Sequence, residues 1–160
     1  MSEAIGRHAV ALASVRELAA RADALRVVLL VDEGDDAQAT MVEWAGDGTL
    51  ELTEAGITET VEPAAMAQVG PAVLPDVVAV PPTAMTVDPD TGELAAPLGA
   101  LAGLAEAVVA LAAAFGGRSV ATAEFATRDP QRPLMLAARI GEPVVAQLGG
   151  ETFAFPEGWP

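Results

Sequence analysis

Residues 25–31 read LRVVLLV, and this stretch decides how the neighbouring elements must pack around it. Five large apolar side chains follow Arg26 without a polar interruption, and the branched ones favour an extended backbone. A continuous apolar run of this length is typical of a strand buried on both faces. The acidic residues DEGDD then end the run and predict a loop. The sequence thus predicts a buried strand over residues 25–31, with other elements packed on both of its sides.

The segment before this strand has the periodicity of an amphipathic helix, over about residues 3–23. Glu3 and Arg7, and again Glu17 and Arg21, are spaced for i,i+4 pairs on the outer side of such a helix. Apolar and small residues, together with the single histidine, recur at helical spacing on the inner side: Ile5, His8, Ala9, Leu12, Val15, Ala19 and Ala22. His8 is expected to be a half-buried helix residue.

Two short strands after the central strand predict a hairpin, over residues 39–44 and 49–53. They flank AGDG, and Val42, Trp44, Leu50 and Leu52 alternate so that they share one face. Residues 57–83 are rich in proline and are predicted to be irregular, with a short helix around residues 64–69 and a brief strand at VVAV. A second hairpin is predicted over residues 84–96.

Leu98–Phe115 is the strongest helix pattern in the chain, because Pro97 precedes it and two glycines follow it. Ala, Leu and Val dominate it, so we expect it to be buried on nearly every side. Gly99 and Gly103 lie on a stripe of small residues that would allow close approach of a sheet or a partner helix. We do not expect a membrane span, because Glu106 would lie mid-bilayer and Ala and Gly contribute little transfer energy.

The last part of the chain, residues 118–155, predicts a meander of antiparallel strands. In VVAQLGGETFAF, two glycines separate two apolar runs, which is typical of a hairpin. The predicted fold is a single α+β domain over residues 1–160: one mainly antiparallel sheet, covered by the N-terminal amphipathic helix and the long Ala-rich helix. This order of elements is similar to the Roadblock group of small dimerising modules, with an additional segment from about residue 53 to 97. The resemblance implies a homodimer.

Charge is distributed very unevenly along the chain. Between residues 27 and 117 there is no Lys or Arg but 15 carboxylates, whereas the eight Arg and the other eight carboxylates lie in the two flanks. The net charge of −15 therefore belongs to the middle of the chain. Such a surface repels phosphate groups, so we expect no binding to nucleic acid or anionic membranes. A basic protein partner fits better, and the residues we expect to bind it are Asp32, Asp35, Asp36, Glu51 and Glu54.

Several catalytic chemistries have no support in the sequence. The absence of Cys excludes disulfides, thiolate nucleophiles and the common structural zinc sites. No Ser lies in a G-x-S-x-G pattern, and no glycine-rich nucleotide-binding pattern occurs. We therefore predict no cofactor. The charged N-terminal residues contain no apolar signal segment, so we expect a cytoplasmic protein.

VDPDTGEL, residues 87–94, has three interpretations. The Asp-x-Asp start resembles an EF-hand loop, but Gly stands where the later ligands are needed. It also resembles the start of a haloacid dehalogenase motif, but no nearby basic residue neutralises a phosphoryl group. The third interpretation is a turn: Asp88 caps amides, Pro89 presets φ and Gly92 takes the left-handed position. We favour the turn.

The sequence predicts a non-catalytic domain that acts through protein–protein contact as a homodimer. One alternative is a metal-dependent hydrolase, because Asp32, Asp35 and Asp36 follow a buried strand, where carboxylates often hold Mg²⁺. The other alternative is a domain that binds an apolar small ligand between the sheet and the Leu98–Phe115 helix.

Overall fold

The computed structural model describes residues 3–22, 24–31, 39–45, 47–67, 72, 86–87, 94–95, 98–116, 118–126 and 131–155. The helices within these ranges are α1 (Glu3–Arg7), α2 (Ala9–Ala22), α3 (Pro63–Met66) and α4 (Leu98–Phe115). The strands of the N-terminal half are β1 (Arg26–Val31), β2 (Thr40–Trp44), β3 (Leu50–Glu54) and β4 (Ile57–Val61). The later strands are β5 (Thr86–Val87), β6 (Leu94–Ala95), β7 (Val120–Phe125), β8 (Leu134–Arg139), β9 (Val144–Leu148) and β10 (Glu151–Phe155).

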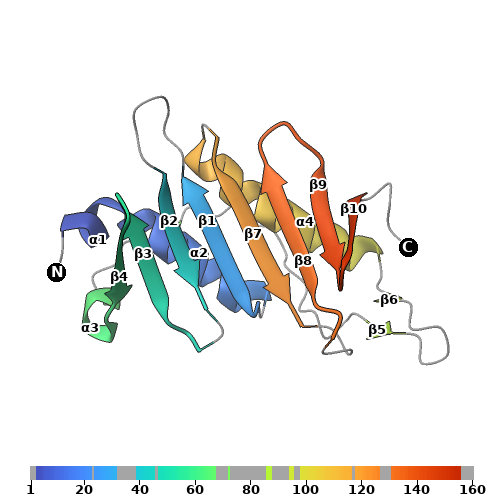
Figure 1. The fold of residues 1–160 in the computed structure, drawn as a ribbon, viewed down its shortest axis with the longest axis horizontal. Helices are drawn as coiled ribbons and strands as arrows, with labels where there is room; N and C mark the ends of the chain where they lie inside the picture. Colours follow the sequence, from blue (N-terminus) through green and yellow to red (C-terminus); the bar gives the residue numbers. More distant parts are fainter. Residues whose placement is uncertain are drawn as a thin grey trace.

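One eight-stranded sheet organises the molecule, in the order β10-β9-β8-β7-β1-β2-β3-β4 (Figure 1). Every neighbouring pair in it is antiparallel. The β1–β7 pair joins two meanders that are far apart in the sequence, with Leu29 opposite Ala121. The prediction of an α+β fold with a mainly antiparallel sheet is therefore confirmed.

Two predicted hairpins occur with the expected side-chain alternation. In β2–β3, Val42 lies opposite Leu52 and Trp44 opposite Leu50, so these four side chains share one face of the sheet. In β9–β10, Leu148 lies opposite Glu151, and Gly149 between them takes a φ of +63°. Only glycine adopts this left-handed conformation without steric cost, which explains why a two-residue Gly-Gly loop joins the strands.

The long helices pack on one face of the sheet, behind the strands in the view of Figure 1. α2 contacts β1, β2 and β3, α4 contacts β7, β8 and β1, and the two helices also contact each other. The strand side chains beneath them are fully buried and include Leu29, Leu52, Phe125 and Leu136. Each strand therefore contributes alternate residues to a single core between sheet and helices.

The predicted N-terminal helix is divided at His8 into α1 and α2. The hydrogen-bond ladder nevertheless continues through this residue, because the His8 N–H donates to Ala4 O at 3.1 Å and the Leu12 N–H donates to His8 O at 3.0 Å. The helical hydrogen bonding therefore continues across the interruption.

The prediction that residues 57–83 are irregular is wrong for its first five residues, Ile57–Val61, which form β4. β4 pairs with β3 from Glu54↔Ile57 to Leu50↔Val61. Ala55 and Gly56 have φ of +54° and +78°, the positive values that a tight two-residue hairpin turn requires. The prolines of this segment all follow Val61, so they do not interrupt the strand.

Two burial predictions are also wrong. β1 alternates between buried Val27, Leu29 and Val31 and an opposite face on which Leu30 is 36% exposed, because the helices cover only one side. α4 buries Leu104, Val108 and Leu111, but its outer face carries exposed Glu106 and Val109. The helix therefore lies on the sheet rather than inside a layered core.

Several predictions fall on residues outside the described ranges. The DEGDD loop, the VVAV strand and the turn residues 88–93 of VDPDTGEL are among them. The described ends of that last segment pair as β5 and β6, with Val87 opposite Leu94.

Candidate interaction surface

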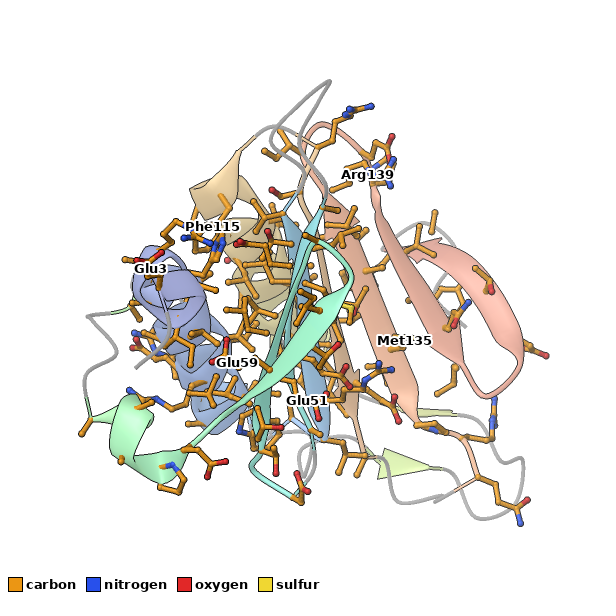
Figure 2. All side chains as sticks on the ribbon, turned by 60° about the vertical axis from the view of Figure 1, so that its left-hand side comes forward. Glu3, Glu51, Glu59, Phe115, Met135 and Arg139 are labelled. Atoms are coloured by element: carbon orange, nitrogen blue, oxygen red, sulfur yellow. The ribbon has the colours of Figure 1, made fainter. Side chains whose placement is uncertain are left out.

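The face of the sheet opposite α2 and α4 is the most extensive candidate surface. Among the residues that the structure describes, no helix or strand lies on it (Figures 1 and 2). Met135 and Arg139 of β8 lie on this side of the sheet, away from the helices (Figure 2). We call it the open face, and it consists of alternate residues of all eight strands.

The ladder registers place an apolar band across the middle of the open face. Leu30 lies between Met41 of β2 and Val120 of β7. Further members of the band are Val28, Met135, Ala137, Val145 and Ala154. Leu30 and Val145 are 36% and 42% exposed. Thr122 lies between Val28 and Ala137 and interrupts the band. Exposed apolar residues gathered on one face mark surfaces that bind another protein.

Acidic side chains border the band on β2 and β3. Glu43 and Glu51 are directly opposite each other in the ladder, an arrangement of like charges that destabilises a sheet. The Arg26 Nε donates a hydrogen bond to Glu43 Oε1 at 2.7 Å, and this hydrogen bond raises the pKa of Arg26. Glu51 has no ion-pair partner within the described part of the chain. The acidic end of the open face is therefore only partly neutralised.

Among the described residues, the other half of the open face carries one cation without an ion pair. Arg139 lies opposite Val120 at the end of β8 and is exposed. Its guanidinium has no ion pair with any described residue. The unpaired Glu51 and the unpaired Arg139 thus lie in opposite halves of one face, while Arg26 of β1 and Glu124 of β7 lie opposite each other between them.

Glu54, three positions after Glu51, lies on the other side of the sheet. Its carboxylate is hydrogen bonded to His8 Nε2 and forms an ion pair with the Arg7 guanidinium. These two hydrogen bonds, with that of His8 the larger effect, lower the pKa of Glu54. The cluster attaches the start of the N-terminal helix to β3. The Glu54 carboxylate therefore already forms its contacts within the domain.

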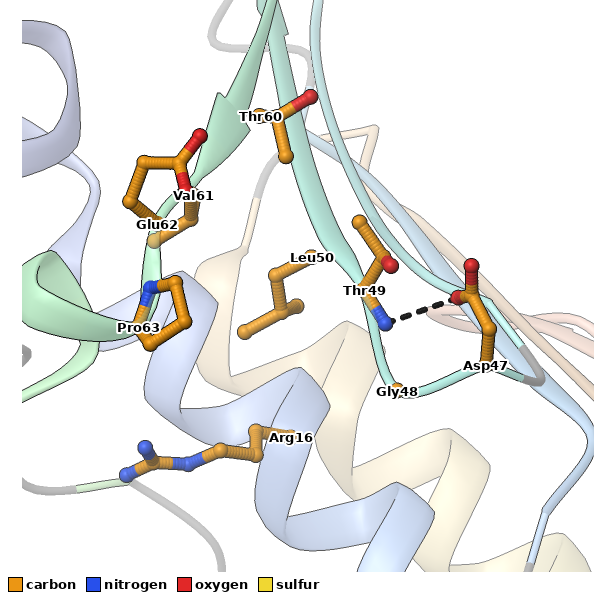
Figure 3. A pocket seen from close by; sticks show the side chains of 9 residues that line it. All are labelled: Arg16, Asp47, Gly48, Thr49, Leu50, Thr60, Val61, Glu62 and Pro63. Atoms are coloured by element: carbon orange, nitrogen blue, oxygen red, sulfur yellow. Dashed lines mark hydrogen bonds between the residues drawn. The ribbon is translucent and has the colours of Figure 1, made fainter.

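A concave feature, separate from the open face, lies at the end of the β2–β3 hairpin (Figure 3). This pocket of about 500 Å³ is lined by α2, the turn at Asp47–Thr49 and the junction between β4 and α3. The Asp47 carboxylate accepts the Thr49 N–H at 2.9 Å, a contact that closes the turn and lowers the pKa of Asp47. Arg16 points away from this carboxylate, with Leu50 between them (Figure 3). The charged groups therefore do not converge on one ligand position.

The structure separates the residues that the sequence predicted to act together. Glu51 lies on the open face and Glu54 on the helix-covered face, so they do not form one acidic surface. Asp32, Asp35 and Asp36 lie outside the described residues. Gly103 is half-buried on α4, and Gly99 lies in the first turn of the same helix. Within the described ranges, no group of three or more His, Asp or Glu residues is arranged to hold a metal ion.

Known proteins add no further constraint. No protein family, curated protein or solved structure matches this chain. In the described part of the chain, no helix is both long enough and apolar enough to cross a membrane.

The sequence contains a signal for the open face in the composition of three strands. In an antiparallel meander with helices on one side, strands usually alternate apolar and polar residues. β1, β8 and β9 instead have apolar residues on both faces, as in RVVLLV and LMLAAR. These unexpected apolar positions, Val28, Leu30, Met135 and Val145, are members of the open-face band.

Proposed function

We propose that this protein is a non-catalytic interaction domain that binds a protein surface through the open face of its sheet. The main support for the proposal is the apolar band on the open face of the sheet. The other face is already covered by α2 and α4. A flat apolar band with charges at its margins has the composition of a protein–protein interface: an apolar centre and a polar rim. The proposed location is the cytoplasm.

The shape of the surface also favours a protein over a small ligand. Small-molecule sites are concave and enclose most of their ligand, whereas the open face is a sheet surface built from strand side chains. The expected partner covers Leu30 with apolar side chains and places a basic group near Glu51. Opposite charges at the margin would speed encounter and make binding sensitive to salt.

Site-specific photocrosslinking in the cells that make the protein tests the proposal. A benzophenone amino acid replaces Leu30 or Val145 on the open face. Val109 of α4 is the matched control, since it is 36% exposed, the same as Leu30, but lies on the helical layer. We expect a discrete crosslinked protein from positions 30 and 145 and none from position 109.

Two results would overturn the proposal. Equal crosslinking from all three positions would show that contact is nonspecific. A lack of crosslinks at positions 30 and 145, in variants that keep the melting temperature of the parent, would show that the open face is not an interface.

A further inference from the structure

We infer that the partner on the open face is a second copy of this chain, related by a two-fold axis that runs parallel to the strands between β1 and β7. This inference rests on the proposed function, because it names the occupant of the same surface. Three observations carry it: the position of the unpaired charges, the register of the apolar residues and the area of the face.

The area of the face matches the requirement of a stable dimer. Eight strands spaced about 4.8 Å apart, with about five residues each, span a face of about 35 Å by 17 Å. This face is about 600 Å² in projection, and its accessible area is larger because side chains stand out from it. A specific interface buries about 800 Å² per partner, so a second copy with the same face supplies a surface of matching size.

The direction of the axis follows from the position of the carboxylates. Glu43 and Glu51 lie level with Val28, in the middle of the strands. A two-fold axis across the strands would stack each strand on its own copy and place Glu43 over the partner's Glu43. Like charges brought together in this way oppose association. An axis parallel to the strands avoids this contact, because it places β2 over the partner's β8.

The same axis joins the unpaired charges and the apolar residues. β1 lies over the partner's β7. Leu30 and Val120 are opposite each other in the β1–β7 ladder of one chain, so they are at the same position along the strands. An axis parallel to the strands keeps this position, and Leu30 therefore meets the partner's Val120. Arg139 lies level with Leu30 and Met41, so it falls over the partner's Met41. Glu43 is two residues further along β2, or about 7 Å away. The long Arg139 side chain spans this distance and reaches the partner's Glu43–Glu51 pair, which Arg26 only partly neutralises.

Face-to-face packing of two sheets with strands nearly aligned is a standard arrangement, with an angle near −30° that arises from sheet twist. The resulting dimer has α2 and α4 of each copy on the outside and one apolar layer between the two sheets. The contact between Arg139 and the acidic pair occurs twice, once on each side of the axis, and β9 and β10 lie outside it over the partner's β3 and β4.

A charge-reversal cycle tests the inference. Sedimentation velocity is recorded from nanomolar concentrations to about 100 µM for the parent, Arg139→Glu, Glu51→Arg and the double variant. We expect a dimer for the parent and a rise in the dissociation constant of about tenfold or more for Arg139→Glu, because three carboxylates then meet. The double variant should recover most of the affinity. Arg16→Glu, the same charge change on α2, should leave the dissociation constant unchanged.

The outcomes separate this inference from the proposed function. A parent that stays monomeric at all concentrations overturns the dimer, and so does an equal effect of Arg139→Glu and Arg16→Glu. If the chain is monomeric but positions 30 and 145 still crosslink to a different protein, the interaction function stands and the second copy is wrong. If neither crosslink nor dimer is found, both fail. Far-UV circular dichroism of each variant confirms that loss of dimer is not loss of fold.

Discussion

Glu43 lies directly opposite Glu51 in the β2–β3 ladder, and Arg26 donates a hydrogen bond to Glu43 alone. Two carboxylates in this arrangement repel each other, so the sheet depends on the cation on β1 for local balance. Glu43 has an exposed side-chain fraction of only 19%, compared with 50% for Arg26. The pair therefore couples the central strand β1 to the acidic end of the open face.

Removal of this cation should destabilise the domain. We expect Arg26→Met to lower the free energy of unfolding by up to about 1 kcal/mol, since a largely exposed ion pair contributes no more than that. The cost should shrink when Glu43→Gln is already present, because Arg26 has then lost its hydrogen-bonded carboxylate and is left with Glu124, which lies opposite it on β7. Urea unfolding of the four proteins in this cycle gives the coupling energy. Arg16→Met is the control, and a loss as large as that of Arg26→Met would show that the ion pair contributes nothing specific.

The Glu54 cluster predicts a dependence of stability on pH. The pKa of Glu54 is lowered in the folded state by His8 and then by Arg7, so the unfolded chain binds a proton at this residue more readily. The stabilisation is present above the ordinary pKa of about 4.3 and is lost as the pH falls through the lower value in the folded protein. Urea midpoints measured from pH 6 to pH 3 should therefore fall more steeply for the parent than for Glu54→Gln.

Glu142→Gln is the control for this measurement, because it removes the same charge from an exposed turn. It should keep the pH dependence of the parent. If Glu54→Gln and Glu142→Gln give the same profile, the contact between α1 and β3 makes no contribution to stability in acid.

The sequence predicted the parts of the fold whose patterns are local. Val42, Trp44, Leu50 and Leu52 occupy one face of a hairpin because their alternation and the AGDG turn specify it together. Leu98–Phe115 is helical over the predicted residues because Pro97 and Gly116 bound it. β4 was missed because ITETV has few apolar residues, and its turn uses Ala55 rather than the usual Asn or Asp.

The placement of the candidate site could not be predicted in the same way. Whether RVVLLV is covered on one face or two depends on where α2 and α4 pack, which is a property of the whole chain. The separation of Glu51 from Glu54 follows from the two-residue period of a strand, because residues three positions apart point to opposite faces. It was missed because the predicted strand ended at residue 53, whereas β3 continues to Glu54. The pairing of Glu54 with Arg7 and His8 joins residues more than 40 positions apart, and no local pattern indicates it.

The turn that joins β3 and β4 should accept a stabilising substitution. Ala55 has a φ of +54°, a left-handed conformation that costs a residue with a Cβ about 1 kcal/mol. Asn tolerates this conformation and is the preferred residue before Gly in such turns. We expect Ala55→Asn to raise the free energy of unfolding by about 0.5–1 kcal/mol. Ala20→Asn, on the exposed side of α2, should do the opposite, since Asn is a poorer helix former than Ala.

The last prediction concerns a hydroxyl group enclosed at the start of β7. Ser119 is fully buried, and its Oγ has no hydrogen-bond partner among the described residues. A buried polar group without a partner costs about 1–3 kcal/mol, because it gives up its hydrogen bonds to water on folding. Ser119→Ala removes the group and little volume, so we expect the free energy of unfolding to rise by about 1 kcal/mol. Ser119→Thr keeps the hydroxyl and adds a methyl group to a closed site, so it should lower stability through overpacking. Thermal and urea unfolding of both variants measure the two changes. A loss of stability in Ser119→Ala would show that the hydroxyl is satisfied in solution, and its contribution to the core would then be favourable.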